Sequence, residues 1–238
     1  GADASHRVQA AINALKIATN VGQLATMDAV YLEAKALALH PTVRVRDRLM
    51  LTMIYESIRG NGNAGAAAAR DLLLFAERTL PPRHRLIIML NCASALRRSG
   101  LPGESESVCE ALFHLAVPFR CYDVAAEACN RMIEMHGDAG RVDAAAEWVV
   151  NYERLRRPKS ELHSHRSLRI AIARVHLWRK QWDAASRLLE KGTARPLWED
   201  AVAQFRSAAL ATKIRLEIGR RCNTDDLSHW VNELASLN

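Results

Sequence analysis

The sequence contains few of the residues that break helices, favour sheets or build disulfide frameworks. Its 238 residues include only 11 glycines, 7 prolines and 5 cysteines, and aromatic side chains make up 5%. By contrast, 49% of the residues are hydrophobic and 25% are charged, with alanine, leucine and arginine prominent, a composition typical of helices. These proportions exclude collagen-like, disordered and disulfide-stapled proteins, and they predict an all-α fold.

Long apolar runs and targeting signals are also absent. No stretch reaches the roughly eighteen consecutive apolar residues that a membrane span requires, and the N-terminus lacks the pattern of a secretory signal. The cysteines form no CxxC pair and fall within helical patterns, where a thiol usually serves as a small apolar side chain. We therefore expect a cytoplasmic protein without membrane contact. Because the chain begins at Gly1 rather than at methionine, we also expect it to be part of a larger protein.

Positive charge is concentrated in the last third of the chain. The net charge is +7, but residues 1–150 hold 16 basic and 16 acidic side chains, whereas residues 151–238 hold 17 and 10. Such a basic stretch attracts anions, although a solvated helix end would carry similar charges. The candidate anion or nucleic-acid patch consists of Arg154, Arg156, Arg157, Lys159, Arg166 and Arg169.

Short helix-opening phrases recur along the chain. Two examples are Gly140-Arg-Val-Asp-Ala-Ala and Lys180-Gln-Trp-Asp-Ala-Ala, which lie 40 residues apart. All six phrases begin at residues 22, 62, 100, 140, 180 and 222. Glycine at the first position suits a helix end that requires a left-handed backbone. Small residues recur five positions later, at Ala67, Ser105, Ala145 and Ala185, where they would let two helices approach closely.

The segments between these phrases have apolar residues at helical spacing, and proline or glycine separates them. We predict helices over 5–20, 24–39, 42–59, 64–79, 83–99, 103–116, 120–136, 142–156, 160–179, 182–191, 197–219 and 224–236. Paired across the tight turns, they form about six antiparallel hairpins with a repeat of about 40 residues. The sequence thus predicts one α-solenoid domain over residues 1–238.

The phrases at Gly140 and Lys180 resemble the opening of the second helix in tetratricopeptide repeats. The period is longer than that family's usual thirty-four or so residues. It is similar to the repeats of large bacterial transcriptional regulators of the MalT-like type. The likeness covers nearly the whole chain and is best over residues 125–150 and 170–189.

This resemblance implies a superhelical groove lined by the first helix of each hairpin. Within it, an exposed position about six residues before the turn glycine often contacts the partner. The groove positions so implied are Lys16, Glu56, Ser94, Glu134 and Arg174, together with Arg59 and Arg97. The same polar residues could instead be ordinary exposed helix positions.

One glycine-rich phrase offers a different interpretation. Gly60-Asn-Gly-Asn-Ala-Gly65 formally matches GxGxxG, and the apolar runs at 49–55 and 86–90 could be buried strands of a dinucleotide-binding unit. The phrase nevertheless occupies the same place as the other turns, and no further alternation of strands and helices follows. No metalloprotease, nucleophile-elbow or P-loop motif is present, and we expect neither metal nor cofactor.

Three functions remain open at this stage. The resemblance favours a noncatalytic scaffold or sensor domain of a bacterial signalling or transcriptional regulator, binding a protein, a peptide segment or a small effector. The basic segment offers nucleic-acid binding as an alternative, with Trp178 and Trp182 available for stacking. The Gly60–Gly65 loop offers nucleotide binding. The oligomeric state is not indicated.

Overall fold

The computed structural model describes residues 2–20, 24–59, 61–155, 163–190, 203–220 and 231–236, and all regular structure there is helical. The predicted all-α class is confirmed in this part of the chain. A short helical segment covers 231–236. The other helices, in chain order, are α1 (Ala2–Asn20), α2 (Leu24–Ala38), α3 (Val45–Arg59), α4 (Gly62–Thr79), α5 (Pro82–Arg98), α6 (Pro102–Ala116), α7 (Tyr122–Asp138), α8 (Val142–Glu153), α9 (His163–Trp178), α10 (Trp182–Glu190) and α11 (Ala203–Arg220).

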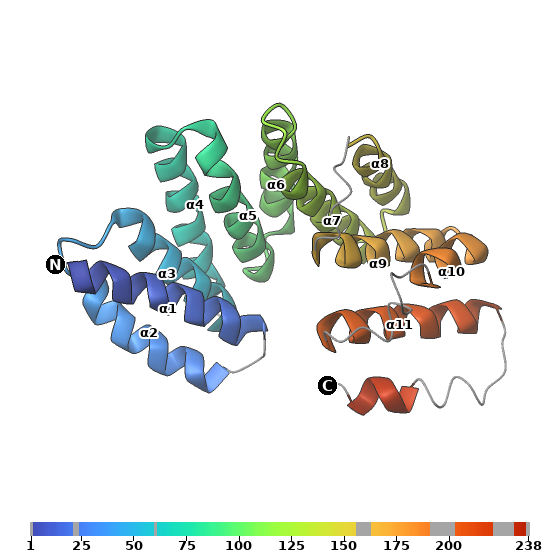
Figure 1. Ribbon diagram of the computed structural model, residues 1–238, viewed down its shortest axis with the longest axis horizontal. Coiled ribbons are helices and arrows are strands. Elements are labelled where there is room, and N and C mark those ends of the chain that lie inside the picture. The colour runs from blue at the N-terminus through green and yellow to red at the C-terminus, as the bar shows by residue number, and fades with distance from the viewer. Residues whose placement is uncertain are drawn as a thin grey trace. The chain divides into compact units, whose positions relative to one another are not determined.

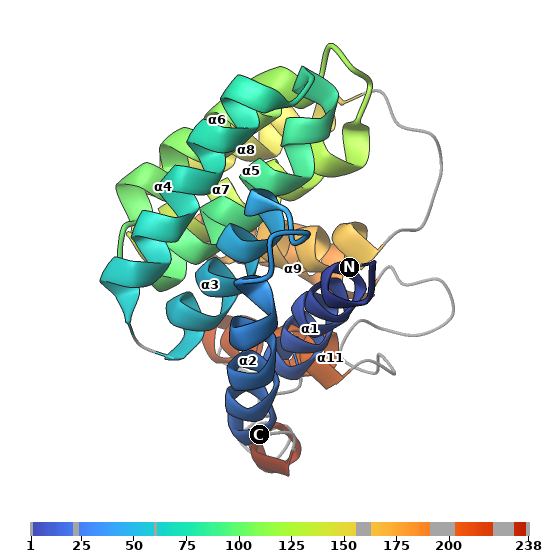
Figure 2. The same cartoon turned by 90° about the vertical axis from the view of Figure 1, so that its left-hand side faces the viewer.

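The chain divides into two compact units, Gly1–Phe119 and Arg120–Asn238. In the first unit each helix packs against the next one, and α3 also packs against α1 and α5. Figure 1 shows α1 beside α2, and Figure 2 shows α4, α5 and α6 running alongside one another. One apolar core runs through this unit, from Val8 and Ile12 of α1 to Cys92 and Leu96 of α5.

The second unit follows the same rule of packing. α9 packs against α7 and α11 as well as against α8 and α10, so the odd-numbered helices contact one another directly. Part of the core lies between α9, α10 and α11, where Ala173, Leu177, Leu189 and Leu216 are buried together. The prediction that residues 1–238 form a single domain stays a prediction.

Three of the turns share one geometry at intervals of 40 residues. Gly100, Gly140 and Lys180 have φ angles of +79°, +71° and +58°. In each turn the amide after this residue donates to a carbonyl five positions earlier, as Arg141 does to His136 at 2.8 Å. These are Schellman-type helix ends, which require a left-handed residue. The next helix starts two residues after each of them, at Pro102, Val142 and Trp182.

Four small residues were predicted to lie where two helices approach closely, and three of them are buried as this requires. Ser105, Ala145 and Ala185 are buried, but Ala67 is exposed, and Gly65 is buried in its place. The phrase in that hairpin therefore starts at residue 60 rather than at 62. A Cβ atom on Gly65 would lie 2.7 Å from the backbone nitrogen of Ser57, so α3 and α4 approach each other too closely for any side chain there.

A related contact joins α7 to α9. The indole of Trp178 covers Gly137 so closely that a side chain on this glycine would collide with the ring. Trp182 lies in the same way on Gly219 of α11, where an added Cβ would come within 2.6 Å of the ring. Large aromatic side chains on glycine thus complete the packing of the second unit.

Candidate functional site

Of the seven implied groove positions, the five that precede the turns by about six residues lie on odd-numbered helices and are half-buried. Each neighbours a buried residue of its own helix, as Lys16 neighbours Leu15 and Ser94 neighbours Ala93. Such positions keep one edge of a polar side chain accessible while its stem packs against the helix surface. They occur on α1 (Lys16), α3 (Glu56), α5 (Ser94), α7 (Glu134) and α9 (Arg174).

In the first unit, the side chains of Lys16 and Ser94 differ in how available they are for contact with a binding partner. Burial lowers the pKa of Lys16, since desolvation disfavours the ammonium form. The hydroxyl of Ser94 donates to the carbonyl of Leu90 at 3.1 Å, so its proton is used within α5. Lys16 is therefore the better candidate for a contact with a partner.

Glu56 and Arg59 fasten α3 to α2. Arg59 forms an ion pair with Asp28 at 2.8 Å, and the hydroxyl of Tyr55 donates to the same carboxylate at 2.8 Å. Tyr55 stacks on Tyr31 of α2 with ring centroids 3.7 Å apart, and the hydroxyl of Tyr31 donates to Glu56 at 3.4 Å. The sequence analysis missed this network because its members come from two helices and share no motif.

The end of α5 is also tied to α3. Arg97 lies half-buried in the last turn of α5. The neighbouring Arg98 reaches back to α3, where its Nε and one terminal nitrogen donate to the hydroxyl of Ser57 at 3.3 and 3.2 Å. This bond holds α5 close to the point where α4 packs on α3.

In the second unit, Arg174 lies at a meeting point of three odd-numbered helices. Its Nε donates to the hydroxyl of Thr212 on α11 at 3.2 Å. Burial lowers the pKa of Arg174, and the charge of Arg215 acts in the same direction, while Glu134 and Asp138 on α7 oppose both. The fold thus brings two of the predicted positions, Glu134 and Arg174, within electrostatic reach of each other. Thr212 and Arg215 continue this line of polar side chains onto α11.

Thr212 fixes how the guanidinium is presented. Its side chain is fully buried, and its hydroxyl donates to the carbonyl of Ala208 at 2.8 Å while accepting from Arg174. Among the described residues, no bond to the two terminal nitrogens of Arg174 is found. A guanidinium held through Nε can offer these nitrogens as a fork to a carboxylate. We call Glu134, Arg174, Thr212 and Arg215 the unit-2 polar row.

A second charged group lies nearer the start of α7. Glu127 and Arg131 form an ion pair at 3.0 Å, one helical turn apart. Burial raises the pKa of Glu127, and the charge of Glu134 adds to this effect, while Arg131 counteracts it. The polar face of α7 therefore continues beyond Glu134.

The basic segment is described only in part. Arg154 is exposed, whereas Arg156, Arg157 and Lys159 lie outside the described residues, as does the side chain of Arg166. Arg169 donates to the carbonyl of Leu188 at 2.5 Å, so it satisfies the end of α10, and burial lowers its pKa. Arg169, one of the six residues of the predicted patch, therefore uses its guanidinium for a hydrogen bond within the fold.

From Asn61 onward, the described part of the glycine-rich phrase forms the start of α4 rather than a strand-to-helix turn. The runs at 49–55 and 86–90, considered above as strands, belong to α3 and α5, which overturns the dinucleotide-binding topology. Asn61 caps α4 by accepting from the amide of Ala64 at 3.3 Å. Gly65 is packed on Ser57, so its surface faces protein.

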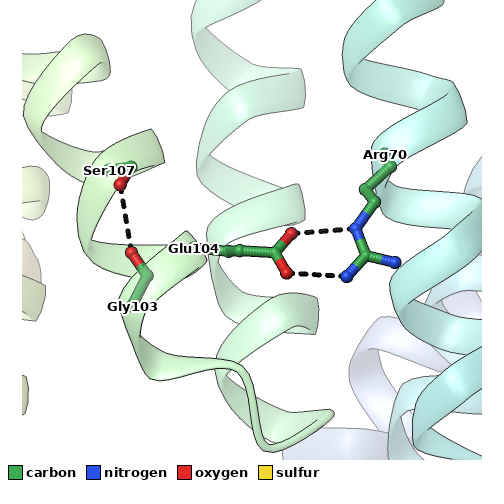
Figure 3. A network of polar contacts seen from close by, with 4 residues as sticks. All are labelled: Arg70, Gly103, Glu104 and Ser107. Carbon is green, nitrogen blue, oxygen red and sulfur yellow. Dashed lines mark hydrogen bonds and ion pairs between the residues drawn. The ribbon is translucent and has the colours of Figure 1, made fainter.

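An ion pair joins α4 and α6 on a solvent-exposed surface. Arg70 donates through two nitrogens to the two carboxylate oxygens of Glu104, at 2.8 and 2.6 Å, as Figure 3 shows. The hydroxyl of Ser107 donates to the carbonyl of Gly103 one turn away. Side-chain exposures of 52% and 43% mark the pair as a surface staple.

Within the described residues, no group of three histidine, cysteine or acidic side chains is placed to hold a metal ion. None of the described helices is long and apolar enough to cross a membrane. Comparisons with protein-family models, with curated proteins and with solved structures gave no significant match to this chain.

Proposed function

We propose that this chain is a noncatalytic binding scaffold made of tetratricopeptide-like hairpins, about six in number. The common geometry of the turns at Gly100, Gly140 and Lys180 supports a repeat of 40 residues. The direct packing of odd-numbered helices on one another in each unit supports it as well. Stacked hairpins of this kind present extended surfaces that bind other proteins.

The observation that carries the proposal is the unit-2 polar row. An arginine that loses hydration on burial, yet has its Nε bond fixed by a buried threonine, is held ready for a partner. Charged side chains on three successive odd-numbered helices, α7, α9 and α11, suit an extended segment better than a compact small molecule. We therefore propose a protein or peptide segment as the ligand.

The resemblance to the repeats of bacterial transcriptional regulators suggests the kind of protein in which this chain acts. There, a segment bound to the odd-numbered helices would favour one arrangement of the hairpins, provided that it binds one arrangement better than another. The chain would then act as the sensor part of a cytoplasmic signalling or transcriptional protein.

The test is capture of partners from a lysate of the source organism on immobilised residues 1–238, with and without nuclease. The double variant Arg97→Glu, Arg174→Glu reverses one charge on an odd-numbered helix of each unit. A matched control, Arg78→Glu with Arg187→Glu, reverses two exposed charges on α4 and α10. We expect the first variant to lose a captured protein that the control retains.

Two outcomes would contradict the proposal. Equal retention by both double variants would show that the odd-numbered helices do not form the binding surface. Retention that disappears with nuclease would assign the function to nucleic acid and to the basic segment, with binding that weakens steeply as salt is added.

A further inference from the structure

Exposed apolar side chains lie beside the unit-2 polar row, nearer the C-terminal ends of α9 and α11. Trp178 follows Arg174 by one helical turn on α9 and is 37% exposed. Ile218 follows Arg215 by three residues on α11 and is 60% exposed. Each of these two helices therefore carries an arginine and a large apolar side chain on one face. We call Trp178 and Ile218 the apolar strip.

The accessible side chains of α11 form one line along the helix. Between residues 208 and 218, the positions that are not buried are Ala208, Ala211, Arg215 and Ile218. They are three, four and three residues apart, which places them on the same face of the helix. Lys213 and Glu217 are buried and pair with each other at 2.7 Å. Within this stretch, Arg215 is thus the charge that α11 presents to a partner.

The helices α7, α9 and α11 run in the same direction, so the polar row and the apolar strip are in register across them. Trp178 at the end of α9 covers Gly137 at the end of α7. Trp182, which follows α9, covers Gly219 near the end of α11. The polar row is formed by residues about one turn earlier on the same helices, and Figure 1 shows α9 alongside α11. A polar line and an apolar line therefore lie next to each other in the second unit.

The sign of the charge changes along the polar line. Glu134 and Asp138 on α7 are acidic, whereas Arg174 on α9 and Arg215 on α11 are basic. Within the described part of the chain, neither arginine has an ion-pair partner. A carboxylate placed between the two arginines would be attracted by both and would remove their mutual repulsion. The same carboxylate would be repelled at the α7 end of the line.

We propose that the ligand is an extended segment of mixed charge, with an acidic residue held between Arg174 and Arg215, an adjacent large apolar residue on Ile218, and a basic residue towards α7. This inference rests on the proposed function, because it specifies what the same surface binds. Successive side chains of an extended segment point to opposite sides, so an acidic residue directed at the polar line places its neighbour on the apolar strip.

The geometry also sets the spacing of the two charges in the segment. Packed helices lie about 8–10 Å apart, and an extended chain advances about 3.3 Å per residue. The acidic residue lies beyond α9 and the basic residue lies on α7, so the two should be about four positions apart in the segment. A segment with its charges reversed or adjacent would fit this surface less well.

The test begins with a random library of displayed peptides, each about nine residues long, selected on immobilised residues 1–238. We expect the enriched peptides to share an acidic residue next to a large apolar residue, with lysine or arginine about four positions away. The affinity of one synthetic enriched peptide is then measured by isothermal titration calorimetry for the wild type and for matched variants.

Two pairs of variants separate the charge from the apolar contact. Arg215→Glu should weaken peptide binding by about tenfold or more, because an attraction becomes a repulsion. Arg187→Glu makes the same charge change at an exposed position of α10 and should leave the affinity unchanged. Ile218→Ser should also weaken binding, whereas Val150→Ser on α8, at a residue 43% exposed, should not.

A charge swap tests the pairing itself. Replacing the acidic residue of the peptide by lysine should weaken binding to the wild type, and Arg215→Glu should restore part of this loss. Enriched peptides without the acidic residue, or equal affinities for Arg215→Glu and Arg187→Glu, would overturn the inference. If such peptides still lost affinity for the Arg97→Glu, Arg174→Glu variant, the odd-numbered helices would remain the binding surface and only the ligand chemistry would be wrong. Absence of any enrichment would overturn the inference as well, and the lysate capture would then decide the proposed function separately.

Discussion

The Nε atom of Arg174 on α9 lies 3.2 Å from the hydroxyl oxygen of Thr212 on α11, and this hydroxyl is fully buried. The bond joins two odd-numbered helices through a charged side chain rather than through apolar packing. It links the stability of the second unit to the side chain that we propose for partner binding.

Replacing Thr212 by valine keeps the shape and removes the acceptor of this bond. We expect the free energy of unfolding of the second unit to fall by about 1 kcal/mol, because the Nε of Arg174 loses its partner at a half-buried site. The measurement is urea unfolding within a double-mutant cycle with Arg174→Met. If Thr212→Val costs as much in the Arg174→Met background as in the wild type, the two residues are not coupled.

The left-handed turns provide a pair of opposite predictions. A Cβ on Gly140 would meet nothing within 4 Å, so Gly140→Ala changes only the backbone preference and should destabilise by about 1 kcal/mol. Lys180 adopts the equivalent conformation at φ +58°, and Lys180→Gly should stabilise by up to about 1 kcal/mol. Thermal melts of both variants check the signs. A loss of stability in Lys180→Gly would mean that the lysine side chain supports the turn.

Gly65 and Gly103 should respond differently to the same substitution. Gly65→Ala forces a methyl group to within 2.9 Å of the Ser57 Cα and should destabilise the first unit by about 1–3 kcal/mol. Gly103→Ala on α6 meets open space and gains helix propensity, so it should be neutral or slightly stabilising. Equal effects in chemical denaturation would contradict the close approach of α3 and α4.

We expect the pKa of Glu104 to lie below the usual value for a glutamate and the pKa of Glu127 to lie above it. The Arg70 guanidinium lowers the pKa of Glu104, so this carboxylate stabilises the fold above its usual pKa and loses that effect as the pH falls through the lowered value. Burial raises the pKa of Glu127, so the folded state favours the neutral form of this side chain. The free energy of unfolding therefore increases as the pH falls through the raised pKa. Carboxyl carbon NMR titration checks the order.

Two variants serve as controls for this titration. Arg70→Gln should return the pKa of Glu104 toward the usual range, since the bonds from the guanidinium are lost. Arg131→Gln should raise the pKa of Glu127 further, because the compensating positive charge disappears. A midpoint for Glu127 below that of Glu104 would refute the assigned environments.

Much of the helical order could be predicted because short-range signals determine it. Proline and glycine mark most of the helix ends, and α4 to α7 begin and end within about two residues of the predicted bounds. α3 begins at Val45 rather than at 42, because His40 and Val43 form a hydrogen-bonded turn first. Residues 197–202 of the predicted eleventh helix lie outside the described part.

The site was predictable only in part. The resemblance to tetratricopeptide repeats implied Glu134 and Arg174 as groove positions, but it could not select Thr212, whose role depends on a contact between residues 38 positions apart. The two-residue error at Ala67 arose because Gly60 and Gly62 both suit a turn, and only packing on Ser57 distinguishes them. Long-range contacts decide such choices, and a single sequence does not contain them explicitly.

The indole of Trp178 on Gly137 has an optical consequence. The side chain is 37% exposed and lies across the contact between α7 and α9, the two helices that carry Glu134 and Arg174. A ligand that parts these helices would hydrate the ring and shift its fluorescence to longer wavelength. The second unit therefore contains an intrinsic fluorophore that can report hairpin opening without a label.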